Sequence, residues 1–371
     1  MYVLKMLAAA FLLLAANMVA LSASQSEERQ PALPRPQEPK PPFPYQSEDV
    51  RYPNPEASGV TLAGTFTRPE SGGPFPAVLL ISGPGPQDRD ETIAGHKPFL
   101  VLADYLTRRG IAVLRVDDRG TAKSTGNFDK STTLDFASDA DASLRYLRSR
   151  PDVDSRRIGL IGHGEGAIIA PMVAVKNPDI AFLVLLAGTA VPGEEVLLAQ
   201  TERSEAAANM TDEQIAADGD IGKLLYDMVR EGKSAGELRK ALSKLPPEYR
   251  PFLPPWEKQL PRFEAPWLRF FLSYNPAPML ERVKCPVLAL QGAKDTQVIA
   301  DQNVPAMKKA FSRGKNHDAA VEVLPGLNYL FQTANTGLGW EYATIPETIS
   351  PVVLEKIGAW IAKHTSAPAN S

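Results

Sequence analysis

Uninterrupted apolar runs alternate along the chain with longer stretches of helical periodicity. The runs that are apolar without alternation cover residues 77–82, 111–116, 158–161 and 180–187. Helical patterns lie between and after them, over residues 99–109, 134–148 and 167–175. Strands that are apolar on both faces are typical of a parallel sheet buried between layers of helices. The pattern therefore predicts an α/β fold with a mostly parallel central sheet flanked by helices.

This alternation is interrupted once, over residues 191–281. That part contains no buried strand, but it has amphipathic helical stretches such as residues 221–230 and a segment rich in proline and aromatic residues over 246–274. Strand and helix patterns resume over residues 287–291, 300–311, 321–324 and 351–364. An insertion of this kind predicts a helical cap over the carboxyl edge of the sheet, where open α/β sheets bind ligands.

The first residues have the layout of a secretory signal. Lys5 precedes an uncharged apolar run over residues 6–21, and small residues follow as far as Ser24. The run approaches the length that spans a bilayer, so an uncleaved membrane anchor is the alternative. No cysteine lies near the cleavage site, which excludes a lipoprotein. We expect an exported protein, periplasmic or extracellular, with no stable membrane insertion once the signal is cleaved.

The next segment, residues 26–56, is polar and dense in proline, which predicts an extended tether. A partner that recognises proline-rich peptides is the alternative. Residues 60–67 alternate between apolar and polar side chains and predict an edge strand, where order begins. The predicted parts are a signal peptide (1–23), a linker (24–58), the two halves of the sheet domain (59–190 and 283–365), the cap (191–282) and a disordered tail (366–371).

Composition excludes several classes of function. The chain has 371 residues, of which 44% are hydrophobic and 22% charged, as in an ordinary soluble globular protein. A net charge of −3 argues against a nucleic-acid partner, which would need a basic face. The chain has one cysteine, Cys285, and four histidines without an H-E-x-x-H pair, so we expect no disulfide framework, no metal site and no cofactor.

The most informative stretch is residues 158–167, IGLIGHGEGA, in which a strand, a tight turn and a helix follow one another. This is the layout of the nucleophile elbow, G-x-S-x-G, in which a strained turn lifts one side chain above a parallel sheet. Gly162 and Gly166 occupy the flanking glycine positions, but the central position is Gly164. The position of the nucleophile therefore carries no oxygen.

Together with four other stretches, this elbow resembles the α/β-hydrolase superfamily. The matching stretches are residues 81–99, 116–126, 158–167, 285–298 and 324–332. They are similar to exported bacterial serine esterases of the serine-aminopeptidase-like, dienelactone-hydrolase-related branch, and the likeness extends from Val60 to about residue 365. The resemblance implies the α/β-hydrolase fold, with the helical cap inserted after the sixth strand.

The resemblance also implies roles for single residues. The acid of a Ser-His-Asp triad falls on Asp295, in the G-x-x-D pattern of residues 292–295. The nucleophile falls on Gly164, and the histidine, which follows L-P-G-x-N in the family, falls on Tyr329. Two of the three triad positions are therefore substituted.

The resemblance also implies a change in the oxyanion hole, which the family builds from two backbone N–H groups. One belongs to the residue after the nucleophile, here Glu165, and the other to the loop formed by Gly83, Pro84 and Gly85. Proline cannot donate a hydrogen bond, so a donor at Pro84 would be lost.

Serine hydrolysis needs an oxygen nucleophile and a base, and tyrosine, with a pKa near 10, is a poor base at neutral pH. The loss of triad members costs on the order of 10⁴ to 10⁶ in rate. We therefore expect a relative of carboxylic-ester hydrolases that is catalytically impaired and keeps a pocket for a small acyl or aryl ligand. The alternative is an active ester or amide hydrolase that uses Glu165 as a non-standard base. No residue pattern indicates an oligomeric state.

Other candidate residues have simpler interpretations. Ser82 and Ser124 lie at the correct edge of the sheet, but the sequence places no histidine beside either. We expect a structural hydrogen bond for His96 and a packing role for His163. Residues 117–119, DDR, are expected to form an ion pair that fixes their loop.

Overall fold

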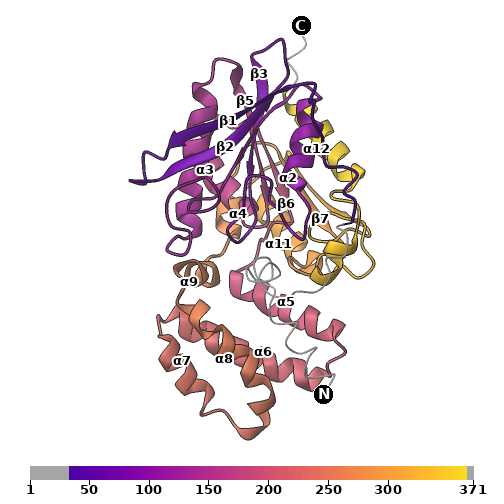
Figure 1. Ribbon diagram of the computed structural model, residues 1–371. Helices are drawn as coiled ribbons and strands as arrows, with labels where there is room; N and C mark the ends of the chain where they lie inside the picture. Colours follow the sequence, from indigo (N-terminus) through magenta and orange to yellow (C-terminus); the bar gives the residue numbers. More distant parts are fainter. Residues whose placement is uncertain (1–32, 366–371) are drawn as a thin grey trace.

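An eight-stranded sheet forms the centre of the computed structural model, which describes residues 33–365 (Figure 1). The strands are β1 (Gln46–Pro53), β2 (Thr61–Arg68), β3 (Phe75–Ile81), β4 (Ala112–Val116), β5 (Val153–His163), β6 (Phe182–Leu186), β7 (Val287–Gly292) and β8 (Ala319–Leu324). Their order across the sheet is β1-β2-β4-β3-β5-β6-β7-β8. The two pairings of β2 are antiparallel and every other pairing is parallel. The predicted α/β fold is confirmed.

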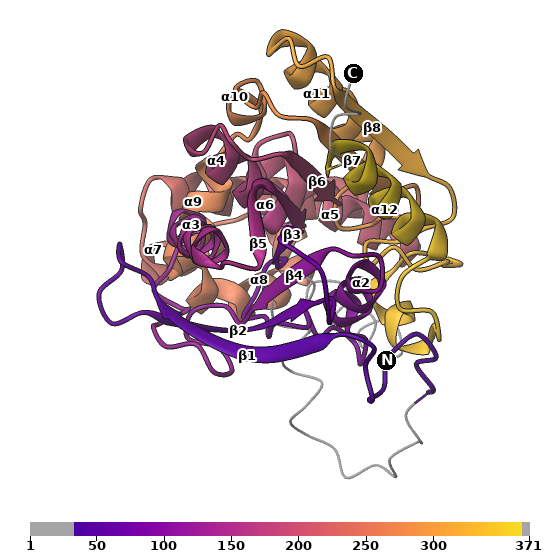
Figure 2. The same cartoon turned by 90° about the horizontal axis from the view of Figure 1, so that it is seen from above.

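Helices cover both faces of this sheet, as Figure 2 shows. They are α2 (Pro98–Thr107), α3 (Thr133–Ser149), α4 (Gly166–Lys176), α11 (Ala300–Arg313) and α12 (Pro351–Thr365). Successive strand residues point to opposite faces, so Leu79 packs in the core under α3 and α4 whereas Val78 packs in the core under α2 and α12. This explains why the strands are apolar without alternation.

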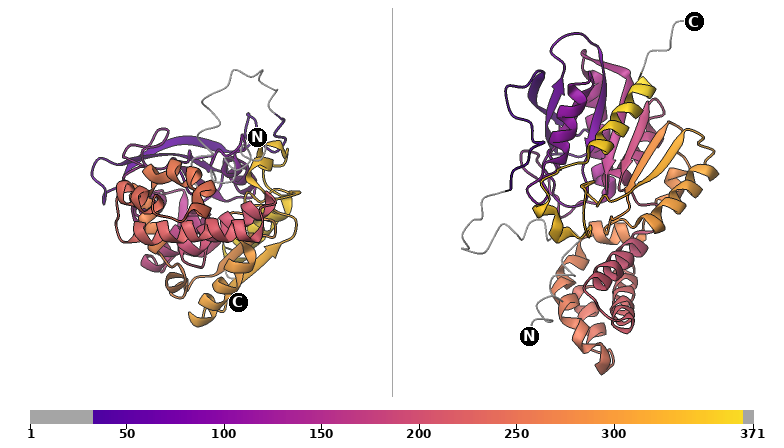
Figure 3. Two further views of the ribbon diagram at one scale, coloured as in Figure 1. Left: turned by 90° about the horizontal axis from the view of Figure 1, so that it is seen from below. Right: turned by 90° about the vertical axis from the view of Figure 1, so that its right-hand side faces the viewer.

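The cap lies between β6 and β7 and projects from one end of the sheet (Figures 1 and 3). It consists of α5 (Gly193–Ala207), α6 (Asp212–Arg230), α7 (Ala235–Leu242), η2 (Pro247–Phe252), α8 (Leu253–Gln259), η3 (Leu260–Glu264), α9 (Pro266–Ser273) and α10 (Ala277–Leu280). Trp256 of α8 is 1% exposed and packs in the cap with the rings of Tyr226 and Phe263. The observed helices agree with the predicted insertion after the sixth strand.

The predicted linker is wrong in its second half, because residues 46–53 form strand β1. Val50 and Tyr52 are buried on the inner face, and the Tyr52 hydroxyl donates to Ser143 Oγ over 2.8 Å. As a consequence β1, and not β2, is the edge strand. The prolines lie before this strand or at its end, where they remove no inner ladder hydrogen bond.

The segment before β1 also contacts the sheet domain. Arg35 Nη1 donates to the carbonyl oxygen of Ile345, and Gln37 Nε2 donates to that of Ile349. The predicted signal peptide (1–23), the first part of the linker and the tail (366–371) lie outside the described residues. Within residues 33–365, no helix has the length and apolar character needed to cross a membrane.

Candidate active site

The elbow between β5 and α4 has the tight geometry that the sequence predicts. A Cβ atom at Gly162 would overlap the backbone of Gly166, and one at Gly166 would overlap the carbonyl oxygen of Ile81. Gly164, at the top of the turn, has φ of +54°. Glycine is required at the two flanking positions because strand, turn and helix backbones meet there.

The side chain of Tyr329 fills the space above Gly164. A Cβ atom at position 164 would lie 2.1 Å from the Tyr329 hydroxyl oxygen and 3.1 Å from Pro84 Cδ. Tyr329 is 7% exposed, and burial, reinforced by the nearby carboxylates of Glu91 and Asp295, raises its pKa well above the ordinary value. The phenol therefore stays protonated and is neither a base nor an anionic nucleophile at neutral pH.

His163, inside the elbow, forms a buried ion pair with Glu91. The imidazole Nδ1 lies 2.8 Å from Glu91 Oε1, and Nε2 lies 3.0 Å from the carbonyl oxygen of Tyr329. Both partners are acceptors, so both ring nitrogens donate and the ring is an imidazolium. Burial alone would lower the pKa of His163, but the charge and hydrogen bond of Glu91 outweigh burial and raise it.

Glu91 also engages the oxyanion loop. The Gly83 N–H group donates to Glu91 Oε1 over 2.6 Å, and Pro84 has no N–H group. Gly85, the third residue of the loop, has φ of +94°. Glu91 is 1% exposed and lies at φ of +52°, which is uncommon for a residue with a side chain. Sequence reasoning did not single out Glu91, because it is one of several acidic residues in the same loop.

Asp295, the predicted acid, follows β7, and its carboxylate is held by two backbone N–H groups and a glutamine amide. Its Oδ1 accepts hydrogen bonds from the N–H groups of Gln297 and Val298, over 2.7 and 2.9 Å. Its Oδ2 accepts from the Gln291 amide over 2.9 Å. Burial raises the pKa of Asp295 to about 7, although these hydrogen bonds oppose the shift.

Glu165, the residue after the nucleophile position, connects the sheet domain to the cap. Its Oε1 accepts from Thr133 Oγ1, at the start of α3, and from Trp267 Nε1 in α9, both over 2.7 Å. Burial raises the pKa of Glu165 to about 7. The side chain therefore has a structural task, and its pKa is also that of a group able to accept a proton near neutral pH.

A small cavity with both apolar and polar lining residues adjoins the elbow on the side of Glu165. Its volume is about 40 Å³, and its lining includes Ser82, Gly83 and Asp118. Ser82 Oγ donates to Asp118 Oδ1 over 2.6 Å, and burial raises the pKa of Asp118 well above the ordinary value. A cavity of this size holds a few water molecules rather than an ester.

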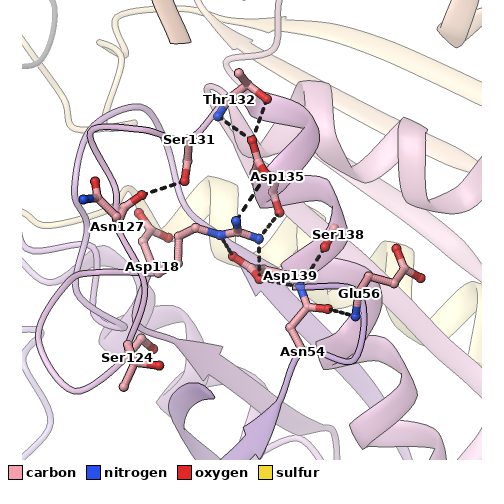
Figure 4. A network of polar contacts seen from close by, with 12 residues as sticks. Asn54, Glu56, Asp118, Ser124, Asn127, Ser131, Thr132, Asp135, Ser138 and Asp139 are labelled. Atoms are coloured by element: carbon pink, nitrogen blue, oxygen red, sulfur yellow. Dashed lines mark hydrogen bonds and ion pairs between the residues drawn. The ribbon is translucent and has the colours of Figure 1, made fainter. Parts of the chain in front are cut away.

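The predicted ion pair within residues 117–119 is wrong. Arg119 pairs outside its own loop, with Asp139 through Nε (2.6 Å) and with Asp135 through Nη1 (3.3 Å), in the network of Figure 4. Asp117 pairs with Arg89 over 2.7 Å. The loop is therefore fixed to α3 and to the loop after β3, because each charged group finds a partner of opposite sign on a neighbouring element.

The remaining candidates have structural roles. His96 is fully buried, and its two ring nitrogens each lie 3.0 Å from an oxygen, Thr348 Oγ1 and the carbonyl oxygen of Tyr342. Ser124 Oγ donates to the carbonyl oxygen of Asp117. No group of three or more histidine, cysteine or acidic residues converges as a metal-binding set in the part of the chain that the structure describes.

Comparisons with known proteins agree with this architecture. The family model of the X-Pro dipeptidyl-peptidases (S15 family) matches residues 58–318. The chain is 28% identical over 271 residues to esterase EstD of Thermotoga maritima, which covers 72% of this chain and 58% of that protein. An uncharacterized protein of Mycobacterium tuberculosis is 33% identical over 127 residues, 34% of this chain and 41% of that one. The chain thus spans less than two thirds of the length of these relatives.

Solved structures show the same fold. An esterase of Pyrococcus furiosus superposes with a TM-score of 0.52 at 18% identity, covering 87% of this chain and 92% of that one. A structure from Klebsiella pneumoniae, described as a dienelactone hydrolase, superposes with a TM-score of 0.50 at 15% identity. The superposition covers 86% of this chain and 99% of that one. With its family match, its sheet and its elbow, the chain belongs to the X-Pro dipeptidyl-peptidase (S15) family of the α/β-hydrolase fold and is related to esterases.

Proposed function

We propose that this protein is a relative of carboxylic-ester hydrolases in which serine-ester hydrolysis is impaired. One observation carries the proposal, namely that the Tyr329 hydroxyl fills the space in which a side chain at position 164 would lie. The site therefore lacks both the nucleophile and the room for one. A tyrosine at the histidine position cannot replace the base, because its pKa is raised.

The arrangement around Glu91 supports the same proposal. In an active hydrolase, N–H groups above the elbow would point at the developing oxyanion. Here the Gly83 N–H group donates to the Glu91 carboxylate, an internal anion, and Pro84 contributes no donor. The loss of one such donor costs about 10² to 10³ in rate, in addition to the on the order of 10⁴ to 10⁶ lost with the triad.

The ligand that we propose is a small acyl or aryl compound that binds beneath the cap. Aromatic rings of α9 reach the elbow from the cap, where Trp267 stacks on Phe271 with ring centroids 5.1 Å apart and donates to Glu165. The cavity beside the elbow has room only for water, so such a ligand would require α9 to move and the bond between Trp267 and Glu165 to open.

The test is hydrolysis of short-chain aryl esters by the purified protein, with a fluorophosphonate probe in a parallel sample. We expect the esters to be hydrolysed no faster than in buffer without the protein, and we expect no covalent labelling by the probe. A labelled serine would contradict the proposal, because another hydroxyl would then act as the nucleophile. A fluorescence titration tests whether a ligand binds beneath the cap. An aryl carboxylate should quench the tryptophan fluorescence of the wild type, and this quenching should be lost in Trp267→Phe.

The second candidate is hydrolysis with Glu165 as the base. Its raised pKa and its position beside the cavity favour this alternative. Turnover without fluorophosphonate labelling, abolished by Glu165→Gln, would establish it. Glu194→Gln, in the cap and away from the elbow, is the matched control.

A further inference from the structure

Two acidic side chains inside the cap lie within hydrogen-bonding reach of each other. Glu205 of α5 and Asp218 of α6 are each 1% exposed. Trp256 of α8 donates its indole N–H to Asp218 Oδ1 over 2.8 Å. The other three carboxylate oxygens, Oε1 and Oε2 of Glu205 and Oδ2 of Asp218, accept no hydrogen bond from any of residues 33–365. We call these two residues the cap carboxylate pair.

No positive charge compensates this pair. Neither carboxylate forms an ion pair with a lysine, arginine or histidine of the described chain. Arg230 of α6 pairs instead with Glu194 of α5. The pair faces the indole of α8 and the phenol of Tyr226 on α6. The charged side chains of α7, η2, α8 and α9, elements that contact α5 or α6, are exposed; they are Glu237, Arg239, Lys240, Glu248, Arg250, Glu257, Lys258 and Arg269.

Two buried carboxylates without a counter-ion cannot both be ionised at low cost. When one carries a proton, it donates to the other and satisfies an oxygen that is otherwise without a donor. The proton then belongs to the pair rather than to one residue. Burial, and for Glu205 also the charge of Asp218, raises the pKa of both groups.

We propose that the cap carboxylate pair is a pH-sensitive closure of the cap, in which a shared proton holds α5 against α6 and its loss separates them. α5 is the first helix after β6 and packs on α9, which carries Trp267 over the elbow. Separation of α5 from α6 therefore loosens the helix that covers the site. The proposal goes beyond the function proposed above and holds whether or not the site hydrolyses esters.

The sign of the effect follows from proton linkage. Because the pKa values are raised in the closed cap, the closed state binds more protons than an open cap in which water reaches both carboxylates. The closed cap is therefore fully stable in mild acid, and its stability falls as the pH rises through the raised pKa values.

Hydrogen exchange of the full-length protein tests this proposal, with protection factors corrected for the intrinsic pH dependence of exchange. The measurement covers roughly pH 5 to pH 10, a range that brackets the pKa values known for buried carboxyl groups. Over this range we expect the protection factors of α5, α6 and α8 to fall about tenfold or more. A tenfold change corresponds to a shift of one unit in a pKa value. Protection in α3 and α11 should stay constant. In Glu205→Gln the amide reproduces the protonated form, so the cap should stay protected at alkaline pH.

Glu202→Gln, an exposed position on α5, is the matched control and should behave like the wild type. If Glu205→Gln does not fold, Asp218→Asn serves instead, since its amide oxygen can still accept from Trp256 while its NH₂ group donates to Glu205. Cap protection that is independent of pH in the wild type, or that falls equally in the wild type and the foldable variant, overturns the proposal.

Discussion

The hydroxyl of Tyr329 and the α-carbon of Gly164 form one sterically coupled pair. A Cβ atom at position 164 would lie 2.1 Å from that hydroxyl, closer than real Cβ atoms approach any neighbour. Tyr329 in this position therefore leaves no room for a side chain at position 164, although the two residues lie on different loops at the carboxyl edge of the sheet. A serine at position 164 is compatible with a smaller side chain at position 329.

The first prediction follows from this overlap. Gly164→Ser alone should lower the free energy of unfolding by about 1–3 kcal/mol, as overpacked cores do, and should show no fluorophosphonate labelling. Gly164→Ser combined with Tyr329→His should recover part of that stability and become labelled. Chemical denaturation and gel detection of the probe measure both effects. Equal stability of the single and double variants would show that the overlap is relieved in another way.

The second prediction concerns the ion pair between Glu91 and His163. Glu91→Gln removes the partner of a buried imidazolium, so we expect a loss of about 3 kcal/mol in the free energy of unfolding. Because the pKa of His163 is raised, its stabilisation is fully present below the ordinary histidine pKa and is lost as the pH rises through the raised value. The difference between wild type and variant should therefore shrink at alkaline pH in denaturant titrations. Glu38→Gln, in a half-exposed pair with Lys97, is the control.

The third prediction concerns Glu165. Its pKa of about 7 lies above the ordinary 4.5, so ionisation destabilises the folded protein as the pH rises through about 7. Glu165→Gln keeps an oxygen that accepts from Thr133 and Trp267 but cannot ionise. We expect it to exceed the wild type in stability at alkaline pH by on the order of 1–3 kcal/mol, with little difference in mild acid. A constant difference across the pH range would contradict a raised pKa in the folded state.

The fourth prediction tests the attachment of β1. Tyr52→Phe removes the buried hydrogen bond to Ser143 and should cost about 1 kcal/mol. Ser143→Ala should cost a similar amount, and the double variant should cost less than the sum, because both remove the same bond. Additive losses in thermal or chemical denaturation would mean that the hydroxyl groups act independently.

The sequence predicted the sheet, the cap and the elbow because each depends on local patterns. Strands such as residues 77–82 are apolar without alternation, and the elbow needs glycine at positions 162 and 166. β1 was missed because the density of proline before it suggested a tether, although Val50 and Tyr52 alternate with polar residues as an edge strand does.

The sequence predicted which chain positions form the site, but it did not predict which side chains touch one another there. Asp295, Tyr329 and Gly164 could be assigned to their places in the chain, yet nothing in the sequence tells that one of these side chains fills the space of another. Glu91 was missed for the same reason, since its pairing with His163 depends on the path of a loop 72 residues away in the chain. Contacts between loops depend on three-dimensional packing and leave no periodic signal.

Combined with the function proposed above, the overlap at the elbow also orders the two substitutions that would place a serine and a histidine at this site. A change at position 329 to a smaller residue leaves a gap, whereas a serine introduced first at position 164 meets the tyrosine hydroxyl. The favourable order thus begins at the histidine position and ends at the nucleophile position, and on the function proposed above the first substitution alone supplies no nucleophile. The order in which position 329 changes before position 164 is thus the one in which no single substitution creates the overlap.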